Sequence, residues 1–279
     1  MKRITIISII LGLAFVAGCS EKGTDSIDSG NPGALIGPSP GIPLGSIMDN
    51  YAQNIDTTKV IGNLTLSNLD AFTIDYIDGD TTYKNANNNK ATLFIFGPND
   101  SSYSINGSNS INSETMAART SNSNRYWAHG DFQNQNNLDL NFGSSNTIQI
   151  GSTAISSSID TTINLFNLTD ITNIQSGDTI SKSTGVTVNW NSTNTDYVNF
   201  NIVQSDFPDS LGAEVHNGSC YLQNTGSYTF SASQMQSFPN AWYHITLSNF
   251  YPYYLYDNNQ NIVIAVAKSK RRITVYLDD

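Results

Sequence analysis

Most of the chain after Val60 consists of short runs in which apolar and polar residues alternate, as in residues 61–66 and 72–76. A period of two places alternate side chains on opposite faces of a strand. Gly, Asn, Asp and Ser divide the runs, which is typical of a β-sandwich or barrel with one solvated face per sheet. The one helical turn that the pattern favours in the first half covers residues 114–119.

The acidic residues support the same fold class, because 20 are Asp and only 3 are Glu. Asp, Asn and Ser favour turns, whereas Glu, Lys and Ala, which favour helices, are scarce. A hydrophobic fraction of 38% and an aromatic fraction of 10% supply enough apolar surface for a core. We therefore expect an all-β protein.

The strand pattern divides into two blocks, residues 51–170 and 171–279. The second block holds seven strand candidates, a number that suits one immunoglobulin-like sandwich. Its motifs GVTVNW (185–190) and TGSYTFSASQM (225–235) resemble Ig-like or fibronectin-III-like modules of bacterial surface lipoproteins. The resemblance implies architecture and a surface role, not an activity. We predict two tandem β-sandwich domains, the second of them Ig-like.

The N-terminus has the order of a secretory signal: Lys2 and Arg3, an uncharged run over residues 4–16, then small residues. As a helix the run would span about 20 Å, which is shorter than the bilayer core. The sequence Val-Ala-Gly-Cys at 16–19 resembles a bacterial lipobox. This implies that residues 1–18 are a signal peptide and that Cys19 carries the lipid that anchors the chain.

Residues 19–50 are expected to form a Gly-, Pro- and Ser-rich linker that holds the folded part away from the membrane. A Ser directly after the lipidated Cys, as Ser20 is here, resembles the sorting signal of outer-membrane lipoproteins. We therefore expect the chain to lie in the cell envelope, anchored in the outer membrane. The net charge of −10 disfavours nucleic acid as a partner.

Few residues form patterns that carry chemistry. Asp75, Asp78 and Asp80 surround an expected turn and are weak candidates for a Ca²⁺ site, but their spacing is not that of an EF-hand and a hairpin turn explains them without an ion. His129 and Asp131 would share a strand face and form a small polar pair. Cys220 has no disulfide partner once Cys19 is lipidated, so it is expected to be a buried apolar residue.

Aromatic residues gather between Phe238 and Tyr256, where eight of the chain's 29 lie. A strand buries one face, so some of these rings should be exposed and able to stack on sugars or anchor a protein. The alternative is that they cover one end of a sandwich or a contact between domains. The candidate ligand-binding residues are Trp242, Tyr251, Tyr253 and Tyr254.

The basic run at 268–272 lies between two expected strands, so it is interpreted as a solvated hairpin tip. No motif of a hydrolase, metalloprotease or nucleotide-binding enzyme is present. The expected function is a non-enzymatic binding or structural role, with a glycan or an envelope protein as ligand. The alternative is a glycan-active hydrolase that uses two Asp carboxylates.

Overall fold

The computed structural model describes residues 44–52, 55–77, 80–96, 103–121, 124–129, 138–191, 194–204 and 217–279. The expected signal peptide, Cys19 and most of the linker lie outside these ranges, as does Asp78. The helical elements are α2 (Leu44–Ala52), η1 (Thr57–Lys59), η3 (Lys182–Thr184) and α3 (Ala232–Met235). The strands are β1 (Val60–Ile77), β2 (Asp80–Ile95), β3 (Ser110–Ile111), β4 (Glu114–Thr115), β5 (Ala117–Ser121), β6 (Asn124–His129), β7 (Ser145–Ile150), β8 (Ile159–Asn164), β9 (Thr179–Ser181), β10 (Val186–Asn189), β11 (Tyr197–Gln204), β12 (Asn217–Gln223), β13 (Ser227–Phe230), β14 (Ala241–Tyr256) and β15 (Ile262–Asp278).

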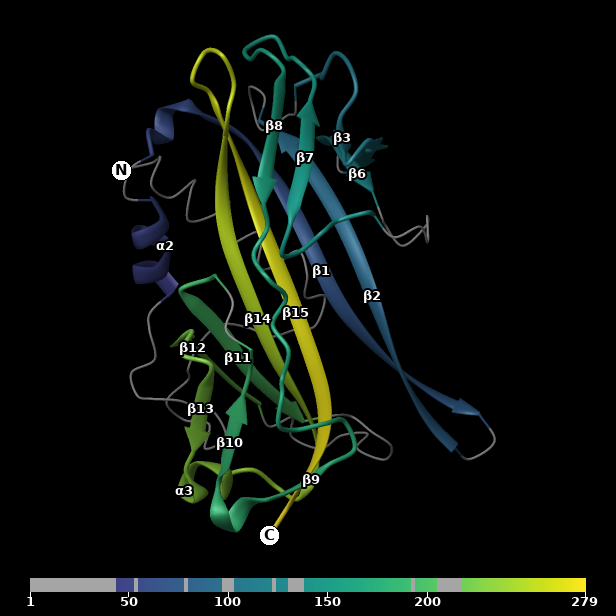
Figure 1. Cartoon of the computed structure of the whole chain (residues 1–279), viewed down its shortest axis with the longest axis vertical. Coiled ribbons are helices and arrows are strands. Elements are labelled where there is room, and N and C mark those ends of the chain that lie inside the picture. Colours follow the sequence, from purple (N-terminus) through teal and green to yellow (C-terminus); the bar gives the residue numbers. More distant parts are fainter. Residues whose placement is uncertain are drawn as a thin grey trace.

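One long sheet runs the length of the molecule (Figure 1). Its strand order is β12-β11-β14-β15-β1-β2-β6-β5, and β9 pairs with the end of β15. β15 is central and pairs antiparallel with β14 and parallel with β1. Two smaller sheets, β4-β3-β7-β8 and β10-β13, complete the described strands.

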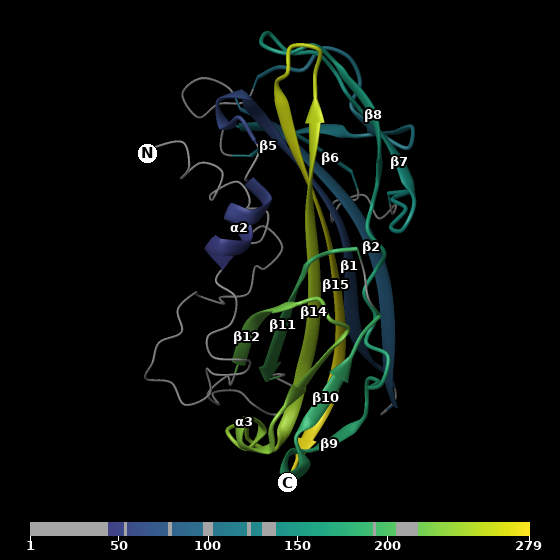
Figure 2. The same cartoon turned by 60° about the vertical axis from the view of Figure 1, so that its left-hand side comes forward.

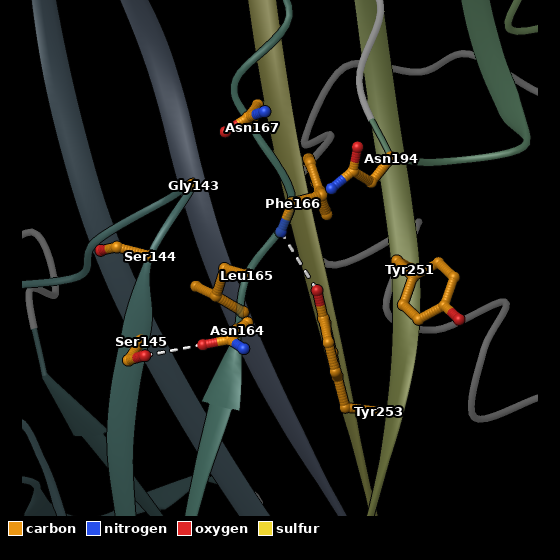
Figure 3. A pocket seen from close by; sticks show the side chains of 10 residues that line it. All are labelled: Gly143, Ser144, Ser145, Asn164, Leu165, Phe166, Asn167, Asn194, Tyr251 and Tyr253. Atoms are coloured by element: carbon orange, nitrogen blue, oxygen red, sulfur yellow. Dashed lines mark hydrogen bonds between the residues drawn. The ribbon is translucent and has the colours of Figure 1, made fainter.

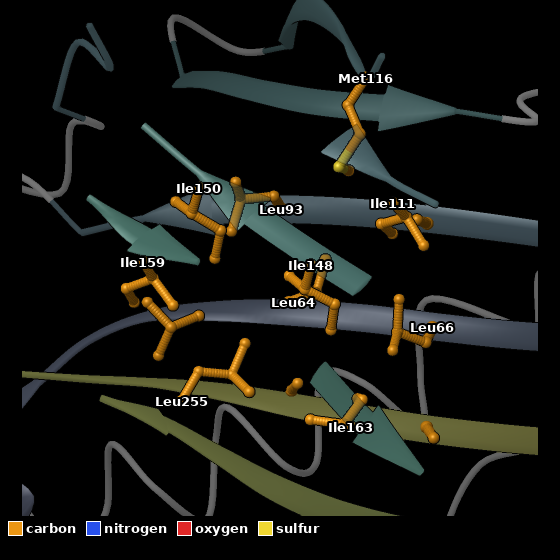
Figure 4. Close-up of a cluster of buried hydrophobic side chains, with 14 of the residues drawn as sticks. Leu64, Leu66, Leu93, Ile111, Met116, Ile148, Ile150, Ile159, Ile163 and Leu255 are labelled. Atoms are coloured by element: carbon orange, nitrogen blue, oxygen red, sulfur yellow. The ribbon is translucent and has the colours of Figure 1, made fainter. Parts of the chain in front are cut away.

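The smaller sheets pack on one side of the long sheet, which we call the sandwich face (Figures 1 and 2). The upper core lies under β3, β7 and β8 and includes Leu64, Leu93, Ile111, Ile148 and Ile163 (Figure 4). The lower core lies under β10 and β13 and includes Val188, Phe200, Phe230, Tyr243 and Val275. The all-β prediction with two sandwich layers is therefore confirmed, and both sandwiches share one sheet.

The hairpin formed by β14 and β15 serves both cores. Leu255, Val263 and Ala265 are buried in the upper core, whereas Ile245 and Leu277 are buried in the lower one. The border predicted at residue 170 separates the smaller sheets, but the two halves share these long strands.

The basic run at 268–272 lies inside β15, so its interpretation as a hairpin tip is wrong. Its residues pair with β14 over Thr246–Phe250, between the two cores. Arg271 forms an ion pair with Asp170 on the sandwich face, which satisfies a cation in the middle of the sheet. None of residues 268–272 belongs to either core, although Leu247, opposite Arg271, is buried in the lower one.

Helix α2 packs on the opposite side of the long sheet, which we call the helix face (Figure 2). Ile47 is fully buried there against Tyr197 and Phe250. The last residues of the expected linker are thus helical, from Leu44 on. Ile47 and Tyr51, four positions apart, lie on one face of this helix, and that face packs on the sheet. No helix in the described ranges combines the length and the apolar character that a membrane crossing requires.

One local prediction differs from the structure, and two further segments differ from what their own pattern of apolar residues suggests. Residues 114–119, expected to be helical, belong to β4 and β5. The alternating run at 138–142 forms no strand, although Leu138 and Leu140 are buried in the upper core. Residues 217–223, which lack a clear alternation, form β12 at the edge of the sheet.

Cys220 of β12 is a free, buried cysteine, as expected. Burial raises the pKa of its thiol to about 12. It is therefore protonated at neutral pH, and the thiolate that would act as a nucleophile is rare.

Candidate ligand-binding groove

The aromatic residues of β14 divide between the two faces of the long sheet because strand side chains alternate. Tyr251 and Tyr253 pack against the upper core on the sandwich face. Tyr254 packs with Ile262 and Ile264 on the helix face. The four aromatic residues proposed from the sequence therefore do not form one site.

Tyr251 and Tyr253 form the pair that the structure brings together. Their ring centroids are 5.1 Å apart and the rings lie at 63°. The Tyr253 hydroxyl oxygen accepts a hydrogen bond from the backbone N–H of Phe166 at 3.1 Å (Figure 3). Burial raises the pKa of Tyr253 to about 12, against the opposing effect of this hydrogen bond, so the phenol stays neutral.

The opposite wall comes from the turn before β7 and the segment after β8. The backbone N–H of Gly143 donates to the carbonyl groups of Leu165 and Phe166, and Leu165 N–H donates to Ser144 O. Gly143 has a φ of +83°, which a residue with a Cβ rarely adopts. Ser145 Oγ donates to Asn164 Oδ1 at 2.7 Å. These bonds hold the turn and the segment after β8 together, and the bond from Phe166 to Tyr253 joins them to β14.

Between the wall and β14 lies an open groove of about 620 Å³ (Figure 3). Its rim carries exposed Asn and Ser side chains, and the two tyrosines are partly exposed in it. Such a volume lies in the range of small-ligand sites, and the lining is more polar than is usual for them. The described residues that line it are Gly143, Ser144, Ser145, Asn164, Leu165, Phe166, Asn167, Asn194, Tyr251 and Tyr253.

The described lining includes no Asp, Glu, His, Lys, Arg or Cys. General acid–base catalysis needs a titratable group within hydrogen-bond reach of substrate. Among the described carboxyl groups, those of Asp257 and Asp279 have shifted pKa values, and both are lowered. A glycosidase acid requires a raised pKa. The described lining thus lacks the pair of carboxyl groups that the hydrolase alternative requires.

The other two proposed aromatic residues have structural partners. Trp242 lies near the other end of β14, and its ring meets Tyr276 edge to face at 5.5 Å. The Tyr254 hydroxyl donates to the backbone carbonyl of Tyr51 in α2. Burial raises the pKa of Tyr254, which keeps this donor protonated. Tyr254 thus attaches α2 to the sheet.

The weak metal candidates lie beyond what the structure describes: Asp78 is outside the described ranges, and so are the side chains of Asp75 and Asp80. Asp131 is also outside. His129 lies 3.3 Å from Glu114 Oε2 and contacts the backbone carbonyl of Thr115 at 3.1 Å. No cluster of three metal-ligating side chains occurs among the described residues.

Sequence reasoning missed the polar side of the groove. Asn164, Asn167 and Asn194 lie on a strand end and two connecting segments that the topology brings to β14. Asn is so abundant in this chain that no single one stands out. Only the three-dimensional arrangement distinguishes these three.

Comparison with known proteins adds little. No family model matches the chain, and no curated protein matches it. Among solved structures, it is similar to the two immunoglobulin domains of DIP-gamma, with 9% identity over 78% of this chain and 98% of that one and a TM-score of 0.18. It is also similar to a structure of Dpr11 IG1 bound to DIP-gamma, with 10% identity over 78% and 98% of the two chains and a TM-score of 0.19. Similarity at this level carries no argument about fold or ligand.

Proposed function

We propose that this chain is an envelope lipoprotein with a non-enzymatic binding or structural role. Its membrane contact is the lipid on Cys19, with the outer membrane as its location and a glycan or an envelope protein as its ligand. The observation that carries the binding role is the groove beside Tyr251 and Tyr253. Its described lining offers aromatic and amide groups but no carboxyl, imidazole, amine, guanidinium or thiol group.

The anchoring part of the proposal is supported by the lipobox-like residues 16–19 and by the position of α2. The helix starts at Leu44 and packs on the helix face, whereas the groove opens on the sandwich face, and the Tyr51 ring of the helix meets Tyr251 of the groove at 5.6 Å. There are 24 residues between Cys19 and Leu44. An extended linker of that length would reach about 75 Å, which separates groove and membrane.

Changing Cys19 to Ser is expected to abolish incorporation of radiolabelled palmitate and to move the chain out of the detergent-extractable membrane fraction. The physical reason is that the thiol is the acceptor of the lipid, and without acyl chains membrane affinity is lost. Cys220→Ser is the matched control, because this buried residue should leave labelling and fractionation unchanged. Labelling that persists in the Cys19 variant would contradict the anchor.

An experiment with the full-length chain in detergent distinguishes the binding role from hydrolysis. The chain is expected to retain a glycan or an envelope protein in a pull-down without releasing new reducing ends from polysaccharide. Stoichiometric retention without turnover supports the proposal. Catalytic release of reducing ends would favour the hydrolase instead.

A further inference from the structure

We infer that the groove binds a neutral glycan, with the Tyr251 ring as the surface on which a sugar stacks. This inference rests on the proposed binding role and names the ligand class. The tyrosine rings and polar groups of the groove come from four parts of the chain: residues 143–145, residues 164–167, Asn194 and strand β14. The ligand would therefore contact both layers of the upper sandwich.

The aromatic part of the groove is held in place before any ligand arrives. Tyr251 meets Tyr253 at 5.1 Å and Tyr51 of α2 at 5.6 Å, both edge to face. Tyr253 is itself fixed by its bond to Phe166. A ring whose orientation is already fixed loses little conformational entropy when a ligand binds, which favours affinity. Tyrosine also combines an apolar face for sugar C–H groups with a polar tip.

The polar part of the groove matches sugar hydroxyl groups, which both donate and accept hydrogen bonds. Asn164, Asn167 and Asn194 each offer an amide with donors and an acceptor, and Ser144 adds a hydroxyl group. All four are exposed. This mixture of rigid tyrosine with adaptable Asn and Ser is the one that binding loops use for polar ligands.

The described lining of the groove carries no charged side chain, and this determines which glycans it favours. An acidic or basic sugar that enters the groove would lose part of its hydration and meet no opposite charge among the described lining residues. The net charge of −10 further disfavours anionic ligands at long range. Neutral oligosaccharides avoid both costs.

A peptide added as a strand is the less suitable occupant. β11 pairs with β14 only as far as Asn249, so the following residues of β14 border β15 alone among the described strands. Pro252 lies in that stretch, and it has no N–H to offer to a new strand. Proline at such an edge is a common way to prevent strand addition.

The test uses the full-length chain in detergent on an array of neutral gluco-, manno-, galacto- and xylo-oligosaccharides, with sialylated and uronate-containing glycans beside them. The wild type should bind at least one neutral glycan, and Tyr251→Ala should weaken this binding about tenfold or more. Tyr251→Phe keeps the ring and should stay within about threefold of the wild type. Asn194→Ala, an exposed change that leaves the core intact, should also weaken binding.

Trp242→Ala is the matched control, because it removes an aromatic ring from the same strand on the helix face. It should bind like the wild type. Binding only to acidic glycans would overturn the inference. So would Tyr251→Ala and Asn194→Ala variants that bind neutral glycans as tightly as the wild type does. A chain that retains an envelope protein and no sugar overturns the glycan assignment but preserves the binding role. A chain that retains neither overturns both.

Discussion

Residues 171–279 produced alone are expected to show no cooperative unfolding transition, although they contain seven strands. In the full chain β1 pairs with β15 over Val60–Leu69 and occupies the edge of β15 that is opposite β14. Removing residues 1–170 exposes Leu255, Val263 and their neighbours in the upper core. Each such side chain contributes about 1.5–3 kcal/mol when buried, and a domain is stable by only about 5–15 kcal/mol in total.

Circular dichroism during urea unfolding, together with the dispersion of amide NMR signals, measures this effect. The matched control is residues 44–279, which keep every described element and should unfold in one transition. Residues 44–170 should also fail, because β15 then no longer pairs with β1. A 171–279 fragment with dispersed signals and a sharp transition would show instead that the two predicted domains are autonomous.

Asp257→Ala is expected to destabilise the protein by about 3 kcal/mol, or about 6–12 °C in Tm. Asp257 is buried at the turn between β14 and β15. Its carboxylate accepts from the backbone N–H groups of Asn259, Asn261 and Ser157, and from the Asn261 side chain, at 2.7–3.0 Å. Its loss leaves the three backbone donors without this acceptor and removes one of the bonds that hold the loop at Ser157 to the hairpin.

The same residue predicts a dependence on pH. Burial alone would raise the pKa of Asp257, but the hydrogen bonds outweigh it and hold the pKa below its usual value. The carboxylate therefore contributes its full stabilisation above the unfolded-state pKa of about 3.9, and loses it as pH falls through the lower folded-state pKa. The difference in stability between wild type and Asp257→Ala should shrink below about pH 4.

Asp160→Ala provides the control for this substitution. Asp160 is exposed and accepts one side-chain hydrogen bond, from Gln149 at 3.3 Å. Its removal should change the stability by no more than about 0.5 kcal/mol. Equal melting temperatures of the two variants in thermal unfolding at pH 7 would show that the bonds to Asp257 do not stabilise the turn.

The fold class was predictable because alternation and turn residues report directly on strands with one buried face. Ile148 and Ile150 alternate with polar residues, and β7 shows that burial pattern. The length of β15 was not predictable in the same way. A basic run normally indicates a solvent-exposed segment. In the central strand β15 the run at 268–272 contributes no residue to either core, and Asp170 pairs with Arg271.

Buried polar residues mark a second limit of sequence reasoning. Asn249 is fully buried between the two cores, where its side chain bonds to Thr169 and donates to Thr195 Oγ1 at 2.6 Å. These contacts join residues 54 and 80 positions apart. No local pattern distinguishes this Asn from the many that lie in turns.

The candidate site was half visible in the sequence. The aromatic density pointed to β14, and Tyr251 and Tyr253 do line the groove. The sequence did not separate them from Trp242 and Tyr254. In one continuous strand the odd-numbered residues lie on one face and the even-numbered residues on the other, but the sequence did not show that the strand is continuous. The facing Asn and Ser residues depend on tertiary contacts and carried no signal.

The bond between Tyr253 and Phe166 has a consequence for finding the ligand. It ties the long sheet to the segment that leaves the smaller sheet, and the groove lies where the two meet. A molecule seated there would bridge both layers and bind the folded state alone. Its affinity would consequently appear as resistance to heat, rising with the logarithm of its concentration, so that melting curves recorded against a collection of sugars report occupancy without any label.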